Sequence, residues 1–93
     1  MKNIAIITGA SSGMGREFVR QLDGQYEEIW GIGLGQEALD RVKEETKTPF
    51  VGLDLDLTKQ ESFDIIVKML EEEKPNVQFL ANCSGFGKFG RYD

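Results

Sequence analysis

The residues with the clearest capacity for chemistry form a glycine- and serine-rich loop, Thr8-Gly9-Ala10-Ser11-Ser12-Gly13-Met14-Gly15. The loop follows an apolar run typical of a strand and precedes apolar residues spaced as in a helix. Gly9 can turn the chain, Gly13 leaves room for a pyrophosphate, and Gly15 allows the helix to pack closely against a sheet. The amides and dipole of a helix N-terminus attract phosphate. The loop therefore predicts nucleotide binding, with hydroxyl donors from Ser11 and Ser12.

Two other interpretations of this loop concern what it binds, if anything. Three glycines between a strand and a helix also occur in plain turns that bind nothing. A mononucleotide-binding P-loop is disfavoured, because Gly15 is followed by Arg16 where Lys and then Ser or Thr would be needed.

Short apolar runs alternate with helical periods along the whole chain. The predicted strands are 3–8, 29–34, 50–55 and 77–82, and the predicted helices are 14–22, 36–45 (with Ala38, Leu39 and Val42 inward) and one opening at Thr58 and stopped by Pro75. Two glycines inside 29–34 weaken that strand prediction. Strands separated by helical crossovers predict a parallel α/β sheet with right-handed connections.

Two local patterns predict how the first and third helices are built. Met14, Phe18 and Leu22 recur every four residues and are expected to form the inward stripe of the first helix. Thr58 and Glu61 have the spacing of a capping box, in which Thr58 would cap the third helix and Glu61 would reach back.

Composition bounds the function classes. The chain has 93 residues, enough for one small domain, and 11 Lys+Arg against 16 Asp+Glu give a net charge of −5. This balance argues against nucleic acid or an anionic membrane as a partner, and no apolar run is long enough to span a bilayer. The absence of histidine excludes Ser-His-Asp and Cys-His sites and His-ligated zinc. The lone Cys83 forms no intrachain disulfide, which fits a reducing cytoplasm.

Three motifs, in order and spacing, resemble those of the short-chain dehydrogenase/reductases. The loop from Thr8 to Gly15 is similar to the family's Thr-Gly-x-x-x-Gly-x-Gly coenzyme loop. Asp56-Leu57-Thr58 resembles its Asp-Val/Leu-Thr/Ser element after the third strand. Asn82-Cys83-Ser84-Gly85 resembles its Asn-Asn-Ala-Gly segment after the fourth, with departures at Cys83 and Ser84.

The resemblance implies a Rossmann-type three-layer α/β/α fold, strand order 3-2-1-4, with residues 1–93 as the N-terminal part of a domain that binds NAD or NADP. Asp56 and the amide of Leu57 would hold the adenine, and the segment from Asn82 would lie beside the nicotinamide ribose. The coenzyme contacts implied are Gly9, Ser11, Ser12, Gly13, Met14, Gly15, Leu34, Asp56, Leu57, Asn82, Cys83, Ser84 and Gly85, with no metal ligand.

Some of these residues also have structural interpretations. Asp56 is a reasonable turn or cap residue beside Thr58, and Asn82 could bridge backbone groups at a strand end. Cys83 fits a small core residue better than a reactive thiol, since no cationic residue adjoins it in the sequence.

The resemblance also implies an activity, hydride transfer between NAD(P) and an alcohol or carbonyl. The family's catalytic Ser, Tyr-x-x-x-Lys pair and Asn lie beyond the fourth strand, and neither tyrosine here replaces that pair: Tyr26 is followed four residues on by Trp30, and Tyr92 is next to last. We therefore expect no turnover from this chain, interpreted as a coenzyme-binding half cut short by cloning, proteolysis or a truncated gene. A nucleotide-binding module without chemistry and an inert self-associating fragment are the alternatives.

Coenzyme preference and assembly are the last two predictions. An acidic residue after the second strand would indicate NAD and an arginine NADP, but the chain has Leu34-Gly35-Gln36-Glu37 there. Neither signature is present unless Glu37 reaches back from the helix start, so the choice stays open, and weak binding of either coenzyme is a further alternative. The run 77–82 would be an apolar edge strand with no lysine, proline or obvious bulge. We expect a homo-oligomer through this edge or through the tail that carries Phe86, Phe89 and Tyr92.

Overall fold

The computed structural model describes residues 2–83 of the 93-residue chain. These residues form strands and helices in strict alternation: β1 (Asn3–Thr8), α1 (Gly13–Leu22), β2 (Glu28–Gly33), α2 (Gln36–Glu45), β3 (Phe50–Asp54), α3 (Gln60–Glu73) and β4 (Asn76–Asn82). Every predicted element is present; the bounds 3–8 and 36–45 are as predicted, and the others differ by one or two residues.

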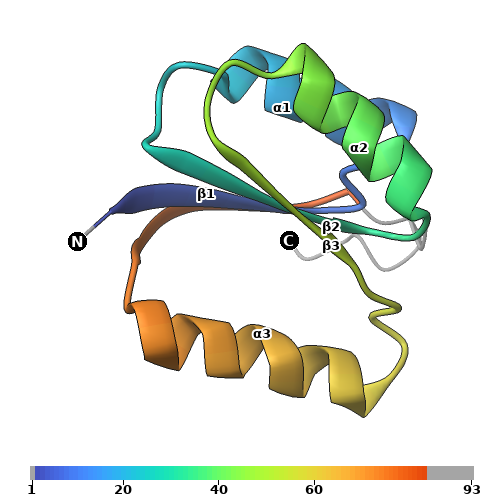
Figure 1. The fold of residues 1–93 in the computed structure, drawn as a ribbon, viewed down its shortest axis with the longest axis vertical. Helices are drawn as coiled ribbons and strands as arrows, with labels where there is room; N and C mark the ends of the chain where they lie inside the picture. Colours follow the sequence, from blue (N-terminus) through green and yellow to red (C-terminus); the bar gives the residue numbers. More distant parts are fainter. Residues whose placement is uncertain (1, 84–93) are drawn as a thin grey trace.

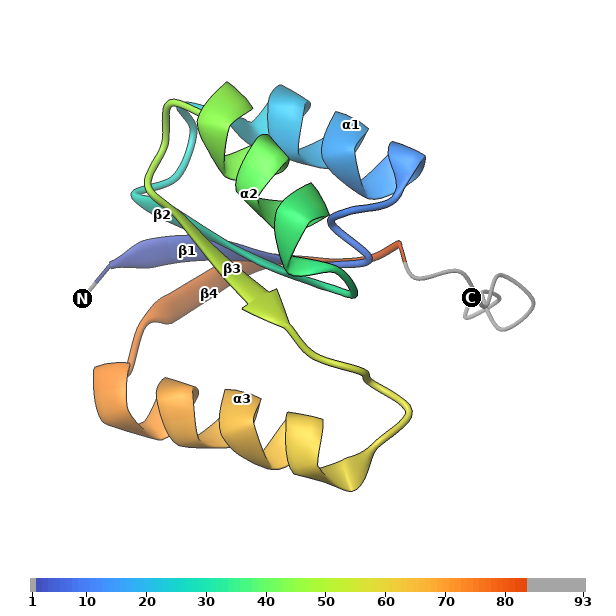
Figure 2. The same ribbon diagram turned by 45° about the vertical axis from the view of Figure 1, so that its right-hand side comes forward.

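The four strands form one parallel sheet in the order β3-β2-β1-β4. Helices α1 and α2 cover one face and α3 covers the other, as Figures 1 and 2 show. This confirms the predicted three-layer α/β/α fold and its strand order. Because the strands are parallel, the loops that follow β1, β2 and β3 all begin at the carboxyl edge of the sheet.

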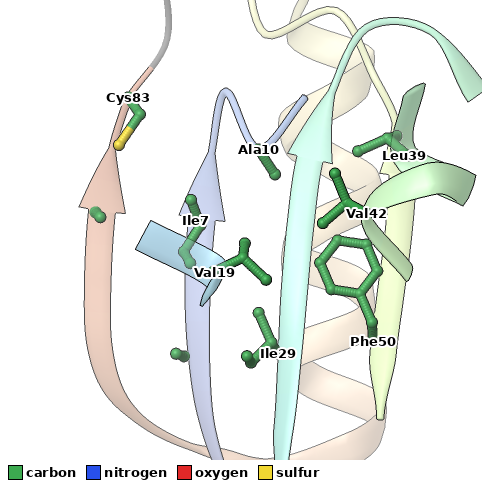
Figure 3. Close-up of a cluster of buried hydrophobic side chains, with 10 residues drawn as sticks. Ile7, Ala10, Val19, Ile29, Leu39, Val42, Phe50 and Cys83 are labelled. Carbon is green, nitrogen blue, oxygen red and sulfur yellow. The ribbon is translucent and has the colours of Figure 1, made fainter. Parts of the chain in front are cut away.

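Each face of the sheet buries its own hydrophobic cluster. The cluster beneath α1 and α2, drawn in Figure 3, contains Ala5, Ile7, Ala10, Val19, Ile29, Leu39, Val42, Phe50, Ala81 and Cys83. The cluster facing α3 contains Ile4, Ile6, Trp30 and Ile32. Alternate residues of β1 and β2 belong to opposite clusters, which explains why both strands are almost continuously apolar.

The glycines inside β2 are required by packing. The ring of Phe50 lies against Gly31, where an added Cβ would collide with it, and a Cβ on Gly33 would meet Ser11 Oγ at 2.7 Å. Side chains from neighbouring elements thus fill the space that the glycines leave, and their packing offsets the low strand propensity of glycine.

The predicted inward stripe of α1 is wrong at its first residue. Phe18 and Leu22 pack partly buried against the core, but Met14 is 65% exposed. The buried residues of α1 are Gly15 and Val19. The first turn rests on the preceding loop through Gly15, so the side chain of Met14 is turned away from the sheet.

The capping-box prediction for α3 is also wrong. The helix begins at Gln60, and its N-cap residue, Lys59, makes no side-chain capping bond. Thr58 Oγ1 donates instead to Asp56 Oδ1 at 2.7 Å. The amide of Thr58 donates to the same carboxylate oxygen at 3.0 Å, and the amide of Lys59 donates to the carbonyl of Asp56 at 3.0 Å. Thr58 therefore belongs to an aspartate-centred turn that precedes the helix, and the N-cap position falls on the next residue. At the other end, Lys74 has a left-handed conformation (φ 47°) just before Pro75, where the stop was predicted.

Strand β4 differs from the sequence expectation in one respect. Val77 pairs with Ile4 and Phe79 with Ala5, so the register shifts and Gln78 is an extra residue, as in a β-bulge. Within the described residues β4 is an edge strand, and its Val77 and Leu80 are 41% and 66% exposed. No helix in residues 2–83 is long and apolar enough to cross a membrane.

Candidate functional site

Gly9 and Ser12 determine the shape of the loop between β1 and α1. Gly9 has φ +69°, a conformation that L side chains rarely adopt. The amide and hydroxyl of Ser12 both donate to the carbonyl of Gly9, at 3.0 and 2.7 Å. Ser12 Oγ then accepts the amide of Gly15 at 3.1 Å and is the N-cap of α1. The sharp turn and the helix start are therefore one hydrogen-bonded unit.

Two glycines of the loop serve opposite purposes. A Cβ on Gly15 would collide with the carbonyl of Gly9 and with Cα of Ala10, so the helix can lie this close only with glycine there. A Cβ on Gly13 would meet no atom within 4 Å. The space above Gly13 is open to a ligand. The amides of Gly13 and Met14 stand in the first helical turn, where a helix supplies no backbone acceptor of its own.

The β1–α1 loop is joined to the end of β2. The amide of Ala10 donates to the carbonyl of Ile32 at 3.0 Å, and Ser11 Oγ donates to the carbonyl of Leu34 at 3.2 Å. The hydroxyl of Ser11, predicted as a ligand donor, is used in this link between loops. The side chain of Leu34 is 63% exposed.

The end of β3 places two carboxylates at the same edge. Asp56 Oδ1 accepts the amide and the hydroxyl of Thr58 at 3.0 and 2.7 Å. These bonds favour the ionised carboxyl and lower the pKa of Asp56 from its ordinary value. Asp54 Oδ1 accepts the amide of Gly35 at 3.0 Å, across from β3 to the turn that opens α2.

A cavity of about 210 Å³ lies among the three loops. It is lined by Gly9, Ser11, Ser12, Ile32, Gly33, Leu34, Leu55, Asp56, Leu57 and Thr58. Its volume is below the usual range for a whole drug-sized ligand, roughly 300–1,000 Å³. The space is suited to one portion of a larger ligand that continues over the open surface at Gly13.

Six of the predicted contact residues line this cavity: Gly9, Ser11, Ser12, Leu34, Asp56 and Leu57. Gly13, Met14 and Gly15 lie beside it in the first turn of α1, whereas Asn82 and Cys83 lie at the end of β4 and do not line it. Ser84, Gly85 and the tail with Phe86, Phe89 and Tyr92 lie outside the described residues.

The end of β4 is connected to the same loop. Thr8 Oγ1 donates to Asn82 Oδ1 at 2.7 Å, and the amide of Cys83 donates to the carbonyl of Thr8 at 2.9 Å. Cys83 is buried, and burial raises the pKa of its thiol. This confirms Cys83 as a core residue and gives Asn82 a structural contact.

Sequence reasoning missed Ile32, Gly33, Leu55 and Thr58 as lining residues and Asp54 as a neighbour of the cavity. An aspartate ending an otherwise apolar strand was the available signal for Asp54. Residues 2–83 contain no group of three or more carboxylate or thiol side chains that could hold a metal ion.

A parallel α/β sheet with a glycine-rich loop, a capped helix N-terminus and a cavity at its carboxyl edge defines a Rossmann-type nucleotide-binding protein. The profile of the family described as short chain dehydrogenase matches residues 3–92. The chain belongs to this family, whose members use a nicotinamide dinucleotide.

Individual relatives are distant and longer. An uncharacterized oxidoreductase of Staphylococcus epidermidis is 25% identical over 84 residues, which are 90% of this chain and 36% of that protein. An NAD-dependent glycerol dehydrogenase of Listeria innocua is 23% identical over 82 residues, 88% of this chain and 32% of that protein. The chain thus spans about a third of the length of these relatives.

Solved structures share the fold. A short chain dehydrogenase from Bacillus anthracis has a TM-score of 0.77 at 22% identity, over 88% of this chain and 34% of that one. The L-sorbose reductase of Gluconobacter frateurii, complexed with NADPH and L-sorbose, has a TM-score of 0.66 at 22% identity, over 83% and 31%.

Proposed function

We propose that this chain supplies the coenzyme-binding part of an oxidoreductase that transfers hydride between NAD(P) and an alcohol or carbonyl group. The observation that carries the proposal is the contrast between Gly13 and Gly15. The second glycine is demanded by the packing of the protein itself, whereas the first faces open space. A residue without a side chain that faces open space is what close passage of a pyrophosphate requires.

Different residues in and beside the cavity would contact different parts of the coenzyme. The amides of Gly13 and Met14 and the positive end of the α1 dipole would hold the pyrophosphate. Asp56 and the amide of Leu57 would hold the adenine, beside Leu34. When bound, the nicotinamide ring supplies the hydride or accepts it.

The end of β4 is proposed as the support for the nicotinamide end. Asn82 and Cys83 continue from β4 toward Ser84 and Gly85, and the contacts of Asn82 and Cys83 with Thr8 fix that strand end next to the phosphate loop. A proton donor would come from outside these 93 residues, because Tyr26 lacks the following lysine. We expect the chain by itself to bind coenzyme without turnover.

The proposal is tested by calorimetric titration of the purified chain with NADH and, separately, NADPH. Gly13→Leu is the decisive variant: its side chain would fill the pyrophosphate space, and we expect at least a tenfold loss of affinity with unchanged thermal stability. Glu72→Leu, at an exposed position near the end of α3, is the control for the same new side chain away from the site, and it should leave the affinity unchanged. Absence of saturable binding by the folded chain, or equal binding by Gly13→Leu, would contradict the proposal.

We also propose self-association through the exposed edge of β4. Leu80 is two-thirds exposed on a strand that forms the edge of the sheet within residues 2–83, and an edge strand can pair with a second copy. Sedimentation at high concentration should reveal dimers or larger species, and Leu80→Lys should weaken them about tenfold. A wild-type chain that stays monomeric would refute this. The cytoplasmic location stays a prediction.

A further inference from the structure

We propose that this site prefers NAD to NADP and that Asp54 is the residue that makes the distinction. This inference rests on the proposed function, because it concerns which coenzyme enters the same cavity. The discriminating carboxylate would come from β3, not from the end of β2, where the sequence offers no charged residue before Glu37.

Asp54 is placed by strand register. It is the last residue of β3 and pairs with Gly33, the last residue of β2. Residues of β3 alternate between faces, so Asp54 shares the α2 face with Phe50. Its Oδ1 accepts the amide of Gly35 at 3.0 Å. The carboxylate is therefore held at the N-terminus of α2, next to Gly33 and Leu34, both of which line the cavity.

The end of β2 cannot provide this group itself. Gly33 has no side chain, and the space where one would begin is occupied by Ser11 Oγ, 2.7 Å from an ideal Cβ. Leu34 is apolar, and Gly35 has φ +98°, which disfavours any side chain. The charged residues beside this corner are Asp54, on the adjacent strand, and Glu37, in the first turn of α2, and Asp54 is the one bonded to Gly35.

The two oxygens of Asp54 differ in their contacts. Oδ1 is engaged by Gly35, whereas Oδ2 receives no hydrogen bond from any residue in 2–83, and the side chain is exposed. A ribose 2′-hydroxyl is a neutral donor that such an oxygen can accept. Asp56 also uses only Oδ1 for its bonds within residues 2–83, but in the proposed function this carboxylate is assigned to the adenine.

The surrounding charges disfavour a 2′-phosphate. The lining residues include one carboxylate, Asp56, and no lysine or arginine. Arg16, in the first turn of α1, is committed to Glu45, whose two carboxylate oxygens lie 3.0 and 2.8 Å from Arg16 Nη2. Lys59 lies close enough to Asp56 to contribute to the lowering of its pKa, and so offsets one of the two carboxylates. A 2′-phosphate carries about −1.5 to −2 charges near neutral pH and would still meet two carboxylates, Asp54 and Asp56, against this one cation.

The test compares two titrations for each of three proteins, all as the full 93-residue chain. We expect the wild type to bind NADH more tightly than NADPH by about tenfold. Asp54→Asn keeps the acceptor for Gly35 but removes the charge, and it should reduce the preference roughly fivefold, mainly by strengthening NADPH binding. Glu72→Gln changes the net charge equally at the far end of α3, and it should leave the preference unchanged.

The outcomes separate this inference from the proposed function. Binding of both coenzymes with equal affinity, or tighter binding of NADPH, would overturn the selectivity and leave the proposed function intact. The same preference in Asp54→Asn as in the wild type would overturn the assignment of Asp54. Failure of the folded wild type to bind either coenzyme would refute the proposed function and this inference together.

Discussion

Aspartate carboxylates lie at both edges of the sheet, but their hydrogen bonding differs between the two edges. At the amino edge, the carboxylate of Asp23 accepts the amides of Lys47 and Thr48 and the hydroxyl of Thr48, at 2.8 to 3.1 Å. The Thr48 hydroxyl in turn accepts the amide of Gly24 at 2.6 Å. At the carboxyl edge, Asp54 and Asp56 each use only one oxygen for bonds to described residues, beside an open cavity.

The number of carboxylate oxygens that the protein itself uses separates Asp23 from Asp54 and Asp56. Asp23 has both oxygens engaged by the protein, and its partner Thr48 is buried, so it fastens the turns before β2 and β3 together. Asp54 and Asp56, at the carboxyl edge, each have one oxygen that accepts no hydrogen bond from residues 2–83. Unused capacity next to a cavity is what a ligand can exploit.

The largest effect on stability is expected from Gly15→Val, which tests whether the contact between the β1–α1 loop and α1 stabilises the fold. The new side chain would collide with the Gly9 carbonyl, and we expect a loss of about 3 kcal/mol in the free energy of unfolding. Urea denaturation monitored by circular dichroism measures this. Gly13→Ala is the matched control and should unfold like the wild type; equal stability of all three proteins would show that α1 does not rest on the loop as described.

A smaller effect is expected at the amino edge. Asp23→Ala removes the acceptor for three donor groups and leaves the buried Thr48 short of a partner, which should cost about 2 kcal/mol of stability while coenzyme affinity is unchanged. A loss of binding with full stability would break the proposed division between the two edges.

The pH dependence of Asp23 follows from the same bonds. The amides of Lys47 and Thr48 lower the pKa of Asp23 below its ordinary 3.8. The stabilisation is therefore complete above the unfolded-state pKa and is lost as pH falls through 3.8 to the lower folded-state pKa. Chemical denaturation between pH 6 and about pH 2.5 should show a steeper acid loss for the wild type than for Asp23→Asn. Parallel curves would assign the acid sensitivity to other groups.

The smallest effect on stability is expected from Asp56→Ala. Asp56 is half-buried and its partner Thr58 is exposed to water, so the Tm should change by no more than about 3 °C. Coenzyme affinity should nevertheless fall severalfold, because Asp56 lines the cavity. Thermal melting and titration of the same sample measure both. A large fall in Tm without a change in affinity would place Asp56 with Asp23 among the structural aspartates.

Local patterns predicted most of the fold correctly. The alternation of apolar runs and helical periods predicted every element, and Pro75 ended α3 as expected. The prediction for the start of α3 was wrong because Thr58 is part of a turn closed by Asp56, which delays the helix, and the spacing of Thr58 and Glu61 does not reveal that turn. The extra residue at Gln78 was missed because a bulge depends on the pairing of β4 with β1, not on β4 alone.

The alternating α/β order and the shape of the β1–α1 loop follow from the sequence alone, since both depend on residues close together in the chain. Glycine at positions 9, 13 and 15 and serine at 12 restrict the backbone locally. Only the tertiary structure decided that Asp54 reaches Gly35, 19 residues away in the chain. That contact depends on the register of β3 against β2, in which the ring of Phe50 packs over Gly31, and residues far apart in the chain meet only through that pairing.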